Sequence, residues 1–225
     1  EIDLNSITGY LSDFLLINGI RTQPDDMFTW TDRAKRHLSL EWGIGAEKLE
    51  YHIGALRRPS KQRQLSDNLA KVVRYYNKKG IYPNIMAHSN GNVIVCQAMS
   101  RNKDIRIGAF FMVMPACWSS MKDNGLADAM LNGRIEQIRF FGAKTDTVVK
   151  MGGGLTGWLK IVGLGYGRAS YEGLTDIPDS IAGLIEQIDV SPWGHSTFGM
   201  PNTLPSFLDV EVLPYACTKK SALDH

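Results

Sequence analysis

Ser89 is the residue of this sequence best placed to act as a nucleophile. An apolar run at residues 82–87 predicts a strand, and residues 92–100 predict a helix directly after it. A serine at the apex of a strand–turn–helix junction, between the small residues Ala87 and Gly91, is typical of a nucleophile elbow. The neighbours must be small because the apex is strained and passes close to adjacent elements. Ser-Asn-Gly also forms ordinary turns, so the rest of the chain has to decide between the two interpretations.

His195 is the candidate general base. A serine hydroxyl becomes a good nucleophile only when a base takes its proton, and that base is a His held in the right tautomer by a carboxylate. His195 lies in a short Trp-Gly-His loop after the last predicted sheet element. Two other histidines precede the elbow and one ends the chain. His88 adjoins Ser89, so we expect its side chain to point elsewhere.

Asp146 is the preferred carboxylate for this base. It directly follows a predicted strand at residues 135–142 and precedes His195 in the chain. Asp123 follows the strand before that one and remains the alternative acid. A further pair of aspartates flanks Pro178, where capping of a turn explains them.

Two backbone N–H groups are needed to stabilise an oxyanion beside Ser89. The first comes from the residue after the nucleophile, which is Asn90, and the second from the loop after an early strand. That loop is the turn at residues 17–21, and Ile20 is the expected donor. Gly19 would allow the Ile20 amide to turn toward the site.

The elements that position these residues alternate along the chain. Strands are expected at residues 14–17, 49–56, 82–87, 105–114 and 135–142. Helices are expected at residues 31–40, 60–79, 92–100 and 126–131, while 181–190 fits either type and the tail from residue 201 fits neither firmly. Alternating strands and helices predict an α/β fold with a mostly parallel central sheet and helices on both faces. The loops that carry Gly19, Ser89, Asp146 and His195 then meet at one sheet edge. With no repeat or linker, residues 1–225 are predicted to form a single domain.

Composition limits the classes of function. The chain has 225 residues, 44% of them hydrophobic and 21% charged, with a net charge of +2, so neither nucleic acid nor an anionic surface is an expected partner. Three cysteines without CxxC spacing and the lack of an HExxH motif predict no disulfide framework, no metal site and no cofactor. No apolar run has the 18 or so residues of a membrane span, and a cytoplasmic location is the default expectation.

The motifs together resemble those of α/β-hydrolase-fold serine hydrolases of the lipase/esterase type. Residues 14–21 resemble the family's apolar strand ending in His-Gly-X, with Asn18 in place of the His. Residues 87–91 resemble Gly-His-Ser-X-Gly, with Ala87 in place of the first Gly. Residues 140–149 resemble its acid motif and residues 193–195 its histidine loop, and the order Ser, acid, His matches the family.

The resemblance implies a cofactor-free hydrolase acting on a small-molecule or lipid-like ester. Acyl transfer, thioester cleavage and amide cleavage use the same residues and stay open, as does a non-catalytic binding protein on the same fold. The oligomeric state is not predicted. Residues 151–167 contain seven glycines and resemble no phosphate loop, so we expect a flap or plain loop beside the site rather than a helical lid. Such a flap would favour short-to-medium acyl chains.

Overall fold

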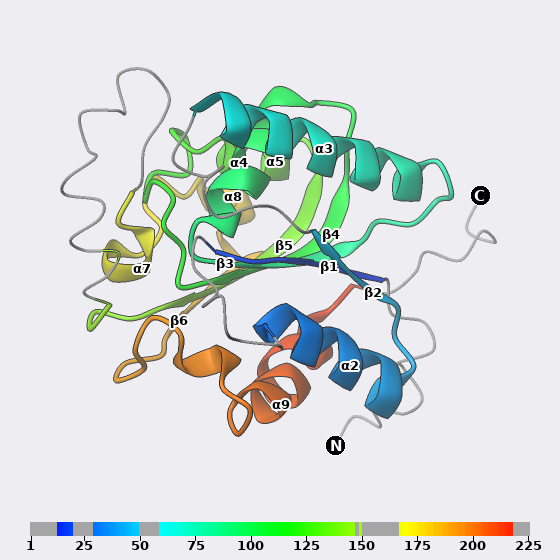
Figure 1. Ribbon diagram of the computed structural model, residues 1–225. Helices are drawn as coiled ribbons and strands as arrows, with labels where there is room; N and C mark the ends of the chain where they lie inside the picture. Colours follow the sequence, from blue (N-terminus) through cyan, green and yellow to red (C-terminus); the bar gives the residue numbers. More distant parts are fainter. Residues whose placement is uncertain (1–12, 20–28, 50–58, 147–148, 150–166, 218–225) are drawn as a thin grey trace.

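Six parallel strands form the central sheet (Figure 1). The computed structural model of the chain describes residues 13–19, 29–49, 59–146, 149 and 167–217. The strand order is β2-β1-β3-β4-β5-β6, and every neighbouring pair is parallel. The strands are β1 (Phe14–Ile17), β2 (Ala46–Leu49), β3 (Asn84–His88), β4 (Ile107–Val113), β5 (Ile135–Gly142) and β6 (Ile185–Asp189).

Helices cover both faces of this sheet. On one face lie α3 (Pro59–Asn77), α4 (Gly91–Arg101), α5 (Leu126–Leu131) and α8 (Asp179–Ala182); on the other lie α2 (Trp30–Trp42) and α9 (Leu204–Phe207) (Figure 1). The short helix α7 (Ala169–Glu172) lies beside β5, and short turns of 3-10 or π type occupy Thr197–Gly199, Leu208–Val212 and Leu213–Tyr215. The predicted fold class is therefore confirmed. None of the helices in the described part of the chain combines the length and the hydrophobicity needed to cross a bilayer.

Two hydrophobic cores result, one on each face of the sheet. Because successive residues of a strand point to opposite faces, Leu15 and Ile17 of β1 pack with α3, α4 and α5, whereas Phe14 and Leu16 pack with α2 and α9. All seven residues of β4 are buried, as expected of a central strand covered on both sides. Full burial of one such Leu, Ile or Phe stabilises the fold by roughly 1.5–3 kcal/mol.

Local signals explain where the longer helices begin and end. Thr29 caps α2 in a capping box with Asp32, and Gly43 ends the helix in the left-handed region at φ 64°. α3 has one apolar stripe, because Leu69 and Val73 are buried in the core and Leu65 packs against it. The helix interpretation of residues 60–79 is confirmed to within two residues at its C-terminus.

Two expectations need correction. The second strand is Ala46–Leu49 rather than residues 49–56; only Leu49 is shared, and residues 50–56 lie outside the described part of the chain. Residues 181–190 contain β6, but they are not the last element, since the tail forms α9 and then packs on the sheet.

Buried Arg139 of β5 holds that tail. Its guanidinium pairs with Glu211 at 3.1 Å and lies 3.3 Å from the ring centroid of Tyr215.

Candidate active site

Ser89 sits on a sharp strand-to-helix turn at the carboxyl end of β3. Its φ of 53° is in the left-handed region, which is strained for a residue with a side chain. Backbone hydrogen bonds from Ser89 N–H to the Val113 carbonyl and from Ala116 N–H to the Ser89 carbonyl fix the turn to the end of β4. A Cβ at Gly91 would come within 2.7 Å of the carbonyl oxygens of Ile17 and Asn18, so a larger residue would push the elbow away from β1.

The side chain of Asn92 supports the same turn, a role that the sequence analysis missed. Its amide nitrogen donates to the carbonyl oxygens of Ala87 at 3.1 Å and of Ser89 at 3.0 Å. Both carbonyls lie at the strained junction, where the regular ladder ends. Asn92 therefore holds the backbone of the elbow on both sides of His88.

Ser89, His195 and Asp146 form a continuous chain of hydrogen bonds. Nε2 of His195 lies 2.9 Å from Oγ of Ser89, and Nδ1 lies 2.9 Å from Oδ2 of Asp146. A carboxylate can only accept, so Nδ1 carries the proton and Nε2 is left to accept from the serine hydroxyl. The three residues follow β3, β5 and β6, whose carboxyl ends lie at one edge because the strands are parallel.

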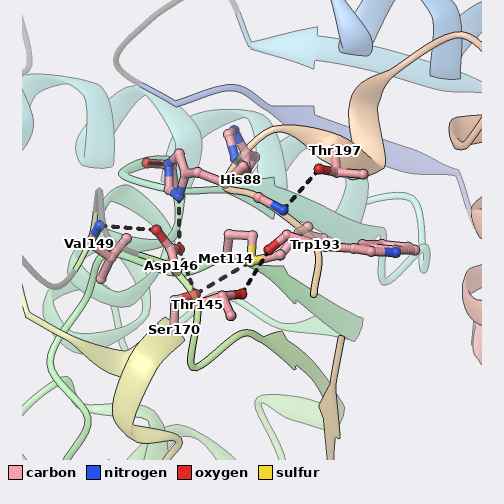
Figure 2. A network of polar contacts seen from close by, with 12 residues as sticks. His88, Met114, Thr145, Asp146, Val149, Ser170, Trp193 and Thr197 are labelled. Carbon is pink, nitrogen blue, oxygen red and sulfur yellow. Dashed lines mark hydrogen bonds and ion pairs between the residues drawn. The ribbon is translucent and has the colours of Figure 1, made fainter. Parts of the chain in front are cut away.

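Asp146 is almost completely enclosed, with 1% of its surface exposed. Burial disfavours the charged carboxylate and by itself would raise its pKa. The hydrogen bond and charge of His195, the Val149 N–H and the Ser170 hydroxyl outweigh that effect and hold the pKa of Asp146 below its usual value. Figure 2 shows Val149 and Ser170 directed at this carboxylate. Asp146 is therefore an anion that can stabilise an imidazolium.

The loops that carry Asp146 and His195 are tied to each other. The Thr145 hydroxyl donates to the carbonyl of Trp193 at 3.2 Å, and the Lys144 N–H donates to Oγ of Ser191 at 3.1 Å. Within the histidine loop, the Gly194 N–H donates to Oγ1 of Thr197 at 2.9 Å (Figure 2). The first two bonds restrict how far the two loops can move apart, and the third fixes the shape of the histidine loop.

His88 supports the backbone of His195, which the sequence did not indicate. Its Nε2 donates to the backbone carbonyl of His195 at 2.8 Å, and its ring centroid lies 4.8 Å from that of His195. The His88 ring also contacts Phe198 and Trp30. Burial, with a smaller contribution from the nearby His195, lowers the pKa of His88 to about 3, so it is neutral at ordinary pH.

The predicted oxyanion donors are only partly described. Asn90 begins the turn into α4 directly after Ser89, whereas Ile20 lies outside the described residues, as do residues 151–166 of the Gly-rich segment. The turn that precedes Ile20 is close to Ser89, since a Cβ at Gly19 would be 2.8 Å from Cβ of that residue. Oδ1 of Asn18 accepts from Nε1 of Trp30 at 2.7 Å and from Gly19 N–H at 2.8 Å, which fixes this turn.

The other candidate residues lie elsewhere. Asp123 is exposed, and its N–H bonds to Oγ of Ser120, while the hydrogen bond from Nδ1 of His195 goes to Asp146. Phe198, three residues after His195, is a core residue packed on Trp30 and Phe207. Among the described residues, no three His, Cys, Asp or Glu side chains are grouped as metal ligands would be.

The fold of the chain is similar to that of several solved structures. No protein-family model matches the sequence, and no curated protein matches it. The Francisella virulence factor BioJ is similar over 91% of this chain and 76% of its own, with a TM-score of 0.53 and 13% identity. A Xanthomonas campestris protein assigned to the alpha/beta superfamily of hydrolases (88% and 98% covered, TM-score 0.48, 15% identity) and a Pyrobaculum calidifontis esterase (84% and 70%, 0.47, 12%) also match.

Proposed function

We propose that this chain, which has the α/β-hydrolase fold, is a serine hydrolase that cleaves carboxylic esters. One observation carries the proposal: the hydroxyl of Ser89, the imidazole of His195 and the carboxylate of Asp146 are joined by hydrogen bonds of 2.9 Å each. A serine on a strained elbow, a base within reach of its proton and a buried anion behind that base are the parts that acyl transfer to a serine requires.

The proposed reaction begins with attack by Oγ of Ser89 on the ester carbonyl carbon. Nε2 of His195 takes the hydroxyl proton as the C–O bond forms, and then gives it to the departing alkoxide. Water, deprotonated by the same nitrogen, then attacks the acyl carbon. The bond from that carbon to Oγ of Ser89 breaks, Nε2 returns the proton to Oγ, and the acid leaves. Asp146 stays ionised throughout and stabilises the imidazolium of His195, in keeping with its lowered pKa.

Backbone amides would stabilise the tetrahedral intermediates. The N–H of Asn90 follows the nucleophile directly, and the N–H of Ile20 is the proposed second donor, because the Asn18–Gly19 turn before it lies against Ser89. Loss of a single oxyanion donor typically costs about 100- to 1,000-fold in kcat.

The test uses a soluble p-nitrophenyl ester and a fluorophosphonate label mapped by peptide mass spectrometry. We expect a burst of p-nitrophenol equal to the enzyme concentration and labelling at Ser89. Ser89→Ala should lower kcat by about 10⁴- to 10⁶-fold, which corresponds to roughly 5–8 kcal/mol. The matched control is Ser196→Ala, an exposed serine beside His195 whose side chain does not cap the turn that follows it.

A second pair of variants tests the acid. Asp146→Asn should lower kcat by orders of magnitude, because Asn favours the wrong tautomer of His195 and leaves its cation uncompensated. Asp123→Asn is the control and should keep wild-type activity. Labelling that persists in Ser89→Ala would refute the assignment of the nucleophile. A wild-type protein with neither burst nor label, but with measurable affinity for esters, would indicate a binding protein instead.

A further inference from the structure

Ser170 makes a contact that neither the motifs nor the Ser–His–Asp arrangement requires. It lies on α7 with 2% of its surface exposed, and its Oγ is 2.7 Å from Oδ2 of Asp146 (Figure 2). Oδ2 is also the oxygen that accepts from Nδ1 of His195. The other oxygen, Oδ1, accepts from Val149 N–H at 3.1 Å. The carboxylate oxygen that faces the base therefore receives two donors.

The proton of this contact belongs to Ser170. A carboxylate has no proton to give, so the hydroxyl must be the donor. Its other close polar neighbour is Sδ of Met114 at 3.4 Å, and a thioether is a weak acceptor. A hydrogen bond to a charged oxygen is shorter and stronger than one to a neutral group, so the hydroxyl points at Asp146.

Backbone contacts hold Ser170 in place independently of Asp146. Its N–H donates to the carbonyl of Pro115 after β4 at 2.9 Å. Its own carbonyl passes so close to β5 that a Cβ at Gly142 would lie 2.6 Å away, and glycine is the residue that permits this approach. The position of the hydroxyl is thus set by β4 and β5 rather than by the acid that it contacts.

We propose that Ser170 is a positioning residue, whose hydroxyl holds Oδ2 of Asp146 against Nδ1 of His195 during ester hydrolysis. This inference rests on the proposed function. The donor also draws negative charge away from Oδ2, so its loss should make the carboxylate a stronger partner for the imidazolium. The neutral form of His195, which is the base, would then be reached at higher pH. His88 on β3 is a further titratable neighbour of the His195 ring, with ring centroids 4.8 Å apart, and the substitution does not change that residue.

The test compares Ser170→Ala with a matched control that contacts the same helix. Oγ of Ser119 donates to Oε2 of Glu172 at 2.6 Å, so Ser119→Ala removes another serine–carboxylate bond to α7 without touching Asp146. We expect Ser170→Ala to lower kcat about tenfold, or about 1.4 kcal/mol, with KM within twofold of wild type. The acid limb of the kcat/KM profile should move up by about half to one pH unit. Ser119→Ala should change neither, and Ser170→Thr should restore both.

A measurement without substrate separates this inference from the proposed function. The pH titration of the His195 ring proton signals in NMR should move upward in Ser170→Ala and stay in place in Ser119→Ala. An unchanged titration with unchanged kcat would overturn the role of Ser170, even if Ser89→Ala is inactive. A moved titration in a protein whose ester hydrolysis survives Ser89→Ala would support the positioning of Asp146 and reject the hydrolase. If Ser170→Ala does not fold, Ser170→Cys, with a weak donor of similar size, provides the same comparison.

Discussion

His88 makes the folded protein sensitive to acid in a way that can be calculated. Its ring is buried against Trp30, Phe198 and His195, and its pKa is lowered to about 3, chiefly by that burial. In the unfolded chain a His has a pKa of about 6.5. Between these values the unfolded state binds a proton that the folded state does not, so unfolding becomes more favourable as the pH falls.

The size of this effect follows from the two pKa values. The contribution is absent above about pH 7.5, where His88 is neutral in both states. Below about pH 6.5 each further pH unit costs roughly 1.4 kcal/mol, which gives about 3 kcal/mol at pH 4. Such a loss is a large part of the 5–15 kcal/mol that typically separates the folded and unfolded states of a domain.

His88→Gln isolates the effect, because Gln does not titrate and keeps an N–H group that can reach the carbonyl of His195. Urea unfolding at several pH values between 8 and 4, followed by Trp fluorescence, gives the free energy of unfolding of both proteins. Wild type should lose about 3 kcal/mol more than the variant across that range, while the difference at pH 8 reports only packing and hydrogen bonding. Asp146 and His195 are present in both proteins, so their titration contributes to both curves. Equal pH slopes would refute the argument that His88 is buried in its neutral form.

Two further predictions concern the elbow. Asn92→Ala should lower the free energy of unfolding by about 1–3 kcal/mol and reduce kcat, because the carbonyls of Ala87 and Ser89 at the elbow each lose one donor. Asn90→Ala should leave stability unchanged or raise it, because the fully buried side chain of Asn90 has no hydrogen-bond partner among the described residues. Denaturant unfolding checks both, and equal losses would contradict this distinction. Gly91→Ala should lower the free energy of unfolding by about 1–3 kcal/mol and abolish ester hydrolysis, because its methyl group would overlap two carbonyl oxygens. Gly183 is the control, because it has helical backbone angles and open space around it, so the melting temperature of Gly183→Ala should lie within a degree or two of wild type or above it. A Gly91→Ala protein with wild-type melting temperature and activity would show that the elbow tolerates displacement.

The strands of the sheet centre could be predicted because burial on both faces leaves long apolar runs. β4 is the example, since all seven of its residues are buried and none is charged. β5 also carries Glu136, Gln137 and Arg139, yet its predicted bounds agree with the structure to the residue. β2 could not be placed, since its sequence Ala-Glu-Lys-Leu is that of a short edge strand with one buried residue, and its pairing with β1 alone defines it. Edge strands carry weak sequence signals because one side faces solvent.

The tail from residue 201, for which the sequence predicted no firm element, does carry the apolar spacing of a helix. Leu204, Phe207, Leu208 and Val212 are all buried, and their spacing is that of one helical stripe. Pro205 is consistent with this stripe, because it lies in the first turn of α9, where Pro is well tolerated. The position of the tail also depends on the charge of Arg139 in β5, which contacts Glu211 and the ring of Tyr215. Such contacts between distant residues leave no local sequence pattern.

The residues that could do the chemistry were predictable for a topological reason. In a parallel sheet the carboxyl ends of the strands share one edge, so polar residues directly after strands converge there. Ser89, Asp146 and His195 all follow strands, and the structure brings them within hydrogen-bonding distance. Their catalytic roles stay predictions until the variants are measured.

The supporting residues were not predictable, because each acts through a contact that exists only after folding. Ser170 reaches Asp146 from 24 positions further along the chain, and His88 reaches the backbone of His195 from 107 positions before it.

The contact of Ser170 with Asp146 and the burial of His88 require opposite protonation behaviour. Asp146 must be ionised to accept two donors on one oxygen, whereas His88 must be neutral to remain buried. The folded site therefore persists only at pH values where Asp146 is ionised and His88 is neutral, which for His88 means a pH well above about 3.

If the site is a hydrolase, loss of activity in acid should have two separable causes. One is reversible protonation of His195 in the folded enzyme, and the other is unfolding driven by protonation of His88. Activity recovered on returning the sample to pH 7, measured in wild type and His88→Gln after equal acid exposure, separates them, because only the second cause should be reduced in the variant.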